Sequence, residues 1–369
     1  MRWGTIPVAS SWEQIISWLV LSFVLYAVAT GKIRFEAAAF GGLLFLGLLG
    51  IGQPETIFSG FASNALFTVA TVLVMSAGLV ESGILNGLGK RIAMRVHKPE
   101  NQILTISLAT GCISAFMNNV GAIGVILPTA QRMAKRAGID KSFYGMPLVY
   151  AALLGGSITL IGVASNIIVS AFRMQAFGQP FRMFDFTAHG LTMAGTGLLL
   201  WFVCRLCGYR LITQEIKDPI PEASLSDDEA RAPQKLIQPA AQRNARGIFI
   251  VAGTLIPVIL LSGMGLVHPS IGFGFVVLIM LGTGILHYEK AFQALNIPAI
   301  IFLGSMLSLA RIMIETGALA AAINQLMPLV IVLPAVPLIL AFVFITAVLS
   351  NILNNSVAAL LMAPTAIII

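Results

Sequence analysis

Long apolar runs separated by short polar stretches dominate the sequence. A membrane-spanning helix needs about 20 mostly apolar residues, and several runs have about this length or more. They lie at about 14–31, 36–53, 63–83, 143–174, 188–210, 247–267, 270–287 and 297–320. The pattern therefore predicts an all-α polytopic membrane protein.

Composition narrows the class further. The chain has 369 residues, of which 57% are hydrophobic and 10% are charged, and its mean hydropathy is +0.92. Soluble domains carry about 25% charged residues, so a water-soluble enzyme is disfavoured. Three cysteines do not build a disulfide framework. In membrane proteins Lys and Arg gather in cytoplasmic loops, so the net charge of +7 indicates orientation and not nucleic-acid binding.

A polar stretch interrupts the apolar pattern between residues 213 and 246. It is rich in acidic and basic residues and contains four prolines, a composition typical of a linker. We predict a first membrane repeat at 1–212, a cytoplasmic linker at 213–246 and a second membrane repeat at 247–369.

The charge pattern predicts a re-entrant helical hairpin in the first repeat. Lys and Arg cluster at 90–98 and again at 132–141, and both clusters should be cytoplasmic. The segment between them, about 101–131, therefore enters and leaves on one side, and each of its arms is too short to span. Its tip falls at Asn118 and Asn119.

A second copy of this hairpin follows near the end of the chain. Residues 114–130 read SAFMNNVGAIGVILPTA and residues 350–366 read SNILNNSVAALLMAPTA, with seven of seventeen positions identical. The loop 321–337 before the second copy has no Lys or Arg and should lie outside. The second hairpin thus enters from the opposite side, and inverted repeats are the signature of a secondary transporter.

Each repeat also carries an acidic tripeptide upstream of its hairpin. Residues 81–83 read Glu-Ser-Gly and residues 315–317 read Glu-Thr-Gly. Carboxylates inside a membrane are candidates for function. Both a structural role and proton coupling remain open for Glu81 and Glu315.

The hairpin tips have the chemistry of a binding site. Non-helical backbone at membrane depth is tolerated where it is buried or lines a cavity. The pairs Asn118–Asn119 and Asn354–Asn355 supply amides, free carbonyls that suit Na⁺, and helix N-termini that favour anions. The alternative is that these asparagines only cap short helices.

The segment 143–174 contains a second break. Gly156 and Gly162 permit unwinding, and the neighbouring hydroxyls and amide are oxygen ligands of the kind hard cations prefer. These oxygen donors are Thr159, Ser165 and Asn166. The alternative is a glycine-rich packing face between helices.

Four stretches resemble the divalent-anion/sodium symporter family (solute carrier family 13), within the citrate transporter-like ion transporter superfamily. They are residues 59–83, 114–128, 146–169 and 350–364. The similarity covers most of the chain outside the linker, and its motifs are specific for the superfamily but not for a substrate.

The resemblance implies roles for the tip residues. In the family, the tips contact a carboxylate or sulfate and help to bind Na⁺. Here Val120 and Val163 stand where hydroxyl-bearing residues are usual. The implied substrate-binding residues are Asn118, Asn119, Asn354, Asn355 and Ser356. The implied cation-binding residues are Asn119, Gly156, Thr159, Gly162, Ser165, Asn166 and Asn355.

The resemblance implies Na⁺-coupled symport of a di- or tricarboxylate or sulfate by alternating access, in a bacterial inner membrane. Neither a cofactor nor a nucleic acid is expected, and a homodimer is expected by analogy. Five residues follow Pro364, so the second repeat is predicted to be incomplete, with its broken helix absent. Proton-coupled or metalloid transport, a membrane-embedded enzyme and a non-transporting fragment are the alternatives.

Overall fold

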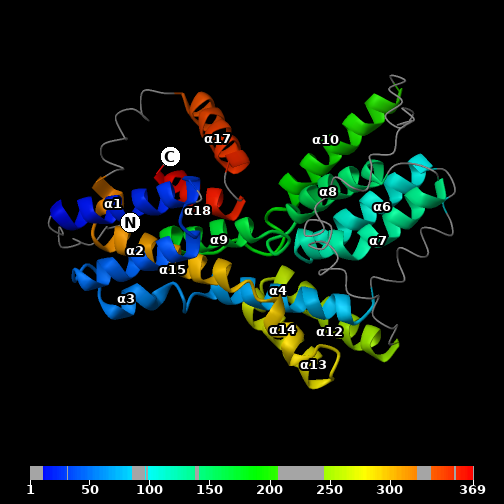
Figure 1. Cartoon of the computed structure of the whole chain (residues 1–369), viewed down its shortest axis with the longest axis horizontal. Coiled ribbons are helices and arrows are strands. Elements are labelled where there is room, and N and C mark those ends of the chain that lie inside the picture. The colour runs from blue at the N-terminus through cyan, green and yellow to red at the C-terminus, as the bar shows by residue number, and fades with distance from the viewer. Residues whose placement is uncertain are drawn as a thin grey trace. The chain divides into compact units, whose positions relative to one another are not determined.

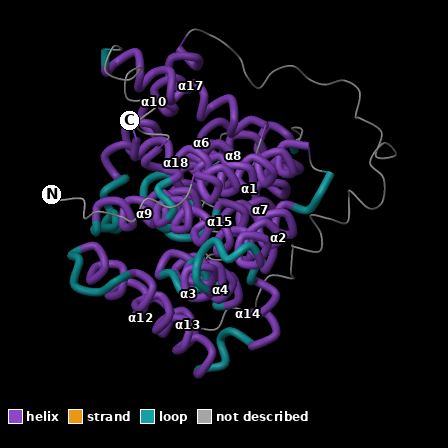
Figure 2. The backbone as a smooth tube through the Cα atoms, turned by 90° about the vertical axis from the view of Figure 1, so that its left-hand side faces the viewer, coloured by secondary structure: helices purple, strands orange, loops and turns teal. Residues whose placement is uncertain are grey.

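The computed structural model describes residues 11–30, 32–84, 96, 99–137, 141–206, 245–321, 334–352 and 355–368. Every regular element among them is a helix (Figure 2). The helices before the linker are α1 (Ser11–Thr30), α2 (Phe35–Leu48), α3 (Pro54–Ser59), α4 (Asn64–Glu81), α6 (Pro99–Ser114), α7 (Asn119–Ala137), α8 (Ser142–Gly156), α9 (Ala164–Phe177) and α10 (Thr187–Leu206). Those after it are α12 (Ala245–Gly263), α13 (Pro269–Gly282), α14 (Tyr288–Ala294), α15 (Ile297–Glu315), α17 (Ala335–Ile352) and α18 (Asn355–Ile368).

These helices fall on the apolar runs, which confirms the prediction of an all-helical chain. By length and composition, the candidate membrane spans in the described part are Pro54–Glu81, Arg246–Gly263 and Ile297–Glu315. Shorter apolar helices lie at Trp12–Val28, Phe35–Leu48, Pro269–Gly282 and Val336–Asn351. Nearly all of the predicted linker, up to residue 244, lies outside the described residues.

The described chain forms two compact units, and each draws on both sides of the linker. Unit 1 comprises Met1–Ala70, Ile167–Phe181 and Leu295–Ile369. Unit 2 comprises Thr71–Asn166 and Arg182–Ala294. Figure 1 labels the helices of both units. The repeat boundaries and the inverted orientation stay predictions.

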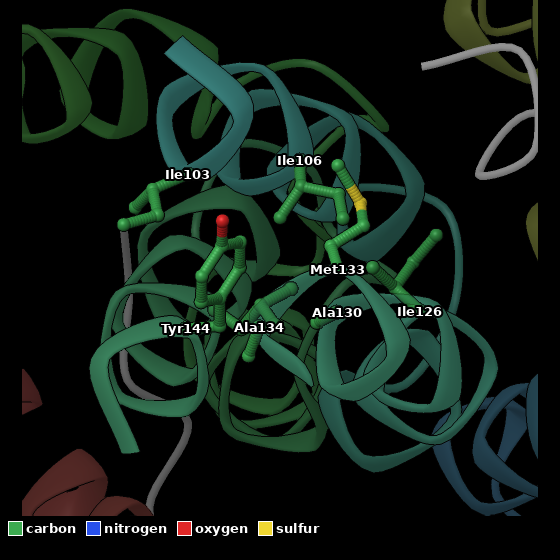
Figure 3. Packing of buried hydrophobic residues seen from close by; sticks show 8 residues of the cluster. Ile103, Ile106, Ile126, Ala130, Met133, Ala134 and Tyr144 are labelled. Carbon is green, nitrogen blue, oxygen red and sulfur yellow. The ribbon is translucent and has the colours of Figure 1, made fainter. Parts of the chain in front are cut away.

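The predicted first hairpin lies in unit 2, where α6 and α7 pack on α8. Its core is apolar and includes one aromatic ring (Figure 3). Buried in this cluster are Ile103, Ile106, Ile126, Ala130, Met133, Ala134, Tyr144 and Leu148. The Tyr144 hydroxyl donates to Gln102 Oε1 at 2.9 Å, so the ring is buried while its polar end keeps a partner.

The second arm of this hairpin is longer than predicted. We expected the hairpin to end near residue 131, whereas α7 continues to Ala137. Arg132 and Lys135 lie in these extra turns, where cations interact favourably with the C-terminal end of the helix dipole. The basic residues therefore extend the helix instead of ending it.

Unit 1 is built around α15, which packs against α1, α2 and α3. The residues of α15 from Phe302 to Leu309 are all buried. The Gly60 N–H donates to Ser308 Oγ at 2.9 Å. A Cβ added at Gly60 would lie 2.1 Å from the Gly304 carbonyl oxygen. Only glycine allows this approach of the turn after α3 to α15.

Candidate functional site

The first tip is a four-residue turn between α6 and α7. Asn118 immediately precedes α7, and its Oδ1 accepts a hydrogen bond from the Val120 N–H at 3.3 Å. Its own N–H donates to Ser76 Oγ on α4 at 3.4 Å. Asn118 therefore caps α7, which is the alternative role that the sequence left open for the tip asparagines.

Asn119 makes a different set of contacts. Ser114 Oγ lies 2.7 Å from Asn119 Oδ1 and 2.8 Å from the Ala152 carbonyl oxygen on α8. A hydroxyl has one proton to donate, so it cannot donate to both oxygens. Both contacts are satisfied if the Asn119 amide turns its NH₂ toward Ser114, since the two ends of an amide are assigned from their hydrogen bonds. In that orientation the amide carbonyl oxygen of Asn119 does not contact Ser114.

The helix interruption next to this tip lies where the glycines and hydroxyls predict it. Helix α8 ends at Gly156 and α9 begins at Ala164. The Thr159 hydroxyl donates to the Ala115 carbonyl oxygen at the tip. Asn166 Nδ2 donates to the Thr159 carbonyl oxygen at 2.9 Å. Side chains thus replace the missing helical hydrogen bonds and join the break to the hairpin.

Two glycines let the backbone of the break fold back on itself. A Cβ at Gly156 would lie 2.3 Å from Asn119 Oδ1, and one at Gly162 would lie 2.2 Å from the Gly156 carbonyl oxygen. Real Cβ atoms do not approach so closely. The glycines therefore allow close packing within the break, and this packing brings the Asn119 amide against it.

The structure thus gathers most of the predicted cation-binding residues of the first repeat. Asn119, Gly156, Thr159, Gly162 and Asn166 are joined by the contacts above. Ser165 lies in the first turn of α9 and is half-buried. These residues carry amides, hydroxyls and backbone carbonyls but no ionisable group, so the first tip is electrically neutral.

The second tip belongs to unit 1. Helix α17 ends at Ile352 and α18 begins at Asn355, and Ser356 follows half-buried. Asn354 lies outside the described residues. Ser350 Oγ donates to Asn355 Oδ1 at 2.7 Å, which repeats the distance and the spacing of the Ser114 contact in the first tip.

The two serines are the residues that sequence reasoning missed. Ser114 and Ser350 are identical in the aligned repeats, so a signal was present. A serine five residues before the tip asparagine shows its role only when the turn brings the two side chains together.

The family model described as "Citrate transporter" matches residues 25–369. The chain belongs to the citrate transporter family. This membership agrees with the resemblance seen in the motifs, and it places the chain in a family of multi-pass membrane transporters and not of enzymes.

Relatives support the same class. The chain is 30% identical to "Uncharacterized transporter sll0640" of Synechocystis sp. over 49% of its length and 30% of that protein's. It is 27% identical to "Uncharacterized transporter YfbS" of Escherichia coli, over 52% and 31%. It is 22% identical to "Sodium/sulfate cotransporter 1" of Chlamydomonas reinhardtii, over 52% and 23%. The matched stretch therefore spans about a third or less of these relatives.

Proposed function

We propose that this citrate-transporter-family chain couples Na⁺ to the symport of a small anion, a di- or tricarboxylate or sulfate, across a bacterial inner membrane. The observation that carries the proposal is the contact between the Asn119 amide and the break at Gly156. The equivalent hydrogen bond between Ser350 and Asn355 in the second tip supports it. Similarity to a relative named as a sodium/sulfate cotransporter supports it as well.

The neutrality of the tip explains why a cation and an anion would bind together. The Asn119 amide oxygen, the Thr159 hydroxyl and carbonyls of the break are oxygens of the type that bind Na⁺. The N-terminal turn of α7 favours negative charge. A bound Na⁺ would add the positive charge that the side chains lack, so cation binding would raise anion affinity.

Alternating access follows from the predicted inverted repeats. The hairpins and broken helix would form the moving part, and the scaffold would come from the segments near 14–53 and 247–287. By family analogy two copies form the working unit, which the mass of the detergent-purified protein would test.

The proposal is tested by uptake into proteoliposomes. We expect labelled sulfate, succinate or citrate to accumulate with an inward Na⁺ gradient and not with K⁺ in its place. Asn119→Ala should abolish the Na⁺-dependent part. Asn101→Ala is the matched control, because Asn101 is an exposed asparagine on the same hairpin, and uptake should persist. Uptake that needs a pH gradient and ignores Na⁺ would replace this proposal with proton coupling.

A further inference from the structure

The helices that precede the two hairpins end in the same way. Helix α4 ends at Glu81 and α15 ends at Glu315. Gly83 and Gly317 follow them with φ of +70° and +71°. The left-handed glycine two residues after each glutamate is a common helix C-terminus. The repeat therefore extends beyond the hairpins, to helices α4 and α15.

The short helices before them also correspond. Residues 47–60 align without gaps with residues 281–294, at the same offset of 234 that separates Glu81 from Glu315. Gly50 and Gly284 occupy one position in this alignment and have φ of +73° and +71°. The other identical pairs are Ile51 with Ile285, Glu55 with Glu289, and Phe58 with Phe292. Helix α3 therefore corresponds to α14, and α2 to α13.

In unit 2, the end of α4 is held by helices from the other side of the linker. Lys290 Nζ of α14 lies 2.6 Å from Glu81 Oε2, and the side chains are 38% and 16% exposed. A Cβ at Gly78 would lie 2.3 Å from the Met280 sulfur on α13. The first-repeat helix is thus packed and ion-paired with second-repeat helices.

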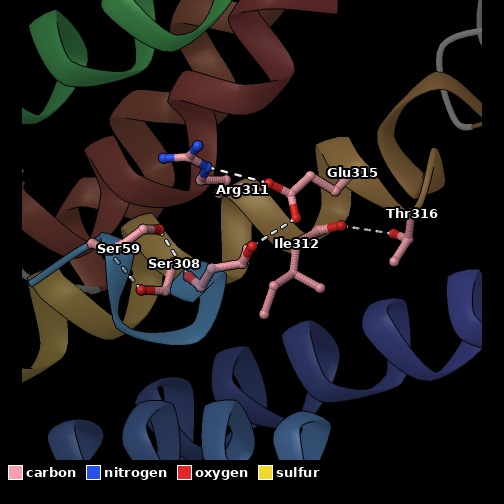
Figure 4. A network of polar contacts seen from close by, with 8 residues as sticks. Ser59, Ser308, Arg311, Ile312, Glu315 and Thr316 are labelled. Atoms are coloured by element: carbon pink, nitrogen blue, oxygen red, sulfur yellow. Dashed lines mark hydrogen bonds and ion pairs between the residues drawn. The ribbon is translucent and has the colours of Figure 1, made fainter. Parts of the chain in front are cut away.

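In unit 1, the arrangement is reversed. The hydroxyl of Thr56 on α3 donates to Glu315 Oε2 on α15 at 2.9 Å, and Arg311 lies 3.3 Å from the other oxygen (Figure 4). Thr56 and Lys290 are equivalent positions in the alignment. The second-repeat helix α15 is therefore held by the first-repeat helix α3.

The carboxylates of Glu81 and Glu315 have the same structural role. A negative charge near a helix C-terminus is unfavourable, yet both repeats place a glutamate there. The compensating cation differs, since it is Lys290 of α14 in one unit and Arg311 of α15 itself in the other. What both repeats keep is a glutamate that accepts a hydrogen bond from the short helix of the other repeat.

We propose that the two repeats exchange these helices. The first-repeat helix α4 contacts α13 at Gly78 and α14 at Glu81, and the second-repeat helix α15 packs against α2 and α3. Glu81 and Lys290 form the positioning contact of one exchange. Because each exchanged helix leads along the chain toward a hairpin, each hairpin is anchored on the other repeat, and movement of one repeat is transmitted to the hairpin of the other. This inference does not depend on the identity of the substrate or coupling ion.

Disulfide trapping tests the exchange in the full chain. In a variant whose three cysteines are replaced by serine, a protease site is placed in the 213–246 linker. A Cβ at Gly78 lies 3.6 Å from Met280 Cγ, and one at Gly304 lies 3.0 Å from Phe61 Cγ, so both pairs are close enough for a disulfide. After oxidation and cleavage, G78C/M280C and F61C/G304C should each migrate as one band that reductant splits into two.

The matched control pairs Gly78 with the repeat equivalent of Met280, which is Leu46. If each repeat held its own helix, G78C/L46C would cross-link instead. Both of its cysteines precede the linker, so this disulfide is read from the thiols that react with a maleimide after oxidation and denaturation, and we expect both thiols to react. Two protected thiols in G78C/L46C, or two bands from an oxidised G78C/M280C variant that purifies as a monodisperse protein, would overturn the exchange.

The ion pair is tested by charge reversal. Glu81→Lys alone and Lys290→Glu alone should each lower the melting temperature of the purified protein, because each places like charges together. The double variant should recover most of the loss. If the melting temperature of the double variant falls by as much as the two single variants' losses together, the positioning role of Glu81 is contradicted.

Discussion

At the scale of single residues, one hydroxyl proton determines which atom the first tip presents. Ser114 is fully buried and lies within hydrogen-bonding distance of both Asn119 and Ala152. The adjacent Asn118 is engaged in capping. Two neighbouring asparagines that look equivalent in the sequence therefore have different surroundings, and Asn119 is the stronger candidate for a ligand.

Removal of the Ser114 hydroxyl should destabilise the hairpin. Ser114→Ala leaves the Ala152 carbonyl and the Asn119 amide without this partner, at a cost of about 1–3 kcal/mol. Ser107→Ala is the matched control on the same helix, because Ser107 Oγ is buried without a hydrogen-bond partner among the described residues, and its removal should cost little. Thermal unfolding in detergent measures both, and equal losses would contradict the assignment.

A histidine outside the spans should make stability depend on pH. His268 precedes α13, and its Nδ1 accepts a hydrogen bond from the Ser270 N–H at 3.3 Å. Burial lowers the pKa of His268 below its ordinary value of 6.5. The unfolded chain therefore binds the proton more readily, and this contribution to stability is complete above about pH 6.5 and is lost as the pH falls toward the folded pKa.

Comparison with an uncharged cap isolates this effect. His268→Asn keeps a side chain that caps helices well but does not titrate. Between pH 8 and pH 5 the melting temperature of the parent protein should fall further than that of His268→Asn. Parallel pH profiles would show that His268 is not responsible.

At the scale of elements, the break between α8 and α9 is a packed structure. Its turn is joined to the hairpin by Thr159 and Asn166, and α10 contributes a hydrogen bond from the Thr187 hydroxyl to the Ile158 carbonyl oxygen at 3.0 Å. Because the interrupted backbone has these partners, the break can hold a defined geometry inside an apolar region.

Two glycines of α8 should respond in opposite ways to alanine. At Gly156 the new Cβ would collide with Asn119 Oδ1, so Gly156→Ala should cost about 1–3 kcal/mol and weaken Na⁺-dependent uptake. At Gly145 a Cβ meets nothing within 4 Å, so Gly145→Ala should be neutral or stabilise by up to about 1 kcal/mol. The melting temperature and the Na⁺-dependent uptake of each variant distinguish the two glycines. If Gly156→Ala keeps the parent's stability and uptake, the break is not part of the site.

At the scale of the whole molecule, the orientation of the repeats is the main prediction still to be tested. Lys141 follows the first hairpin in a basic cluster, and Pro334 lies in a loop without Lys or Arg; both are exposed. In the cysteine-free protein, Lys141→Cys should react with an impermeant maleimide from the cytoplasmic side and Pro334→Cys from outside. Labelling of both from one side would contradict the inverted arrangement.

The sequence by itself determined the helical class, the helix interruption near Gly156, the hairpin tips and the family, because apolar length, glycines, charge bias and repeated motifs are local properties of the chain. Tertiary structure decided which asparagine caps and which faces the break, and that Ser114 and Ser350 contact the tip asparagines. It also decided that Glu81 pairs with Lys290 and Glu315 with Thr56. These contacts join positions as many as 259 residues apart, and their formation depends on how helices pack, which no local pattern encodes.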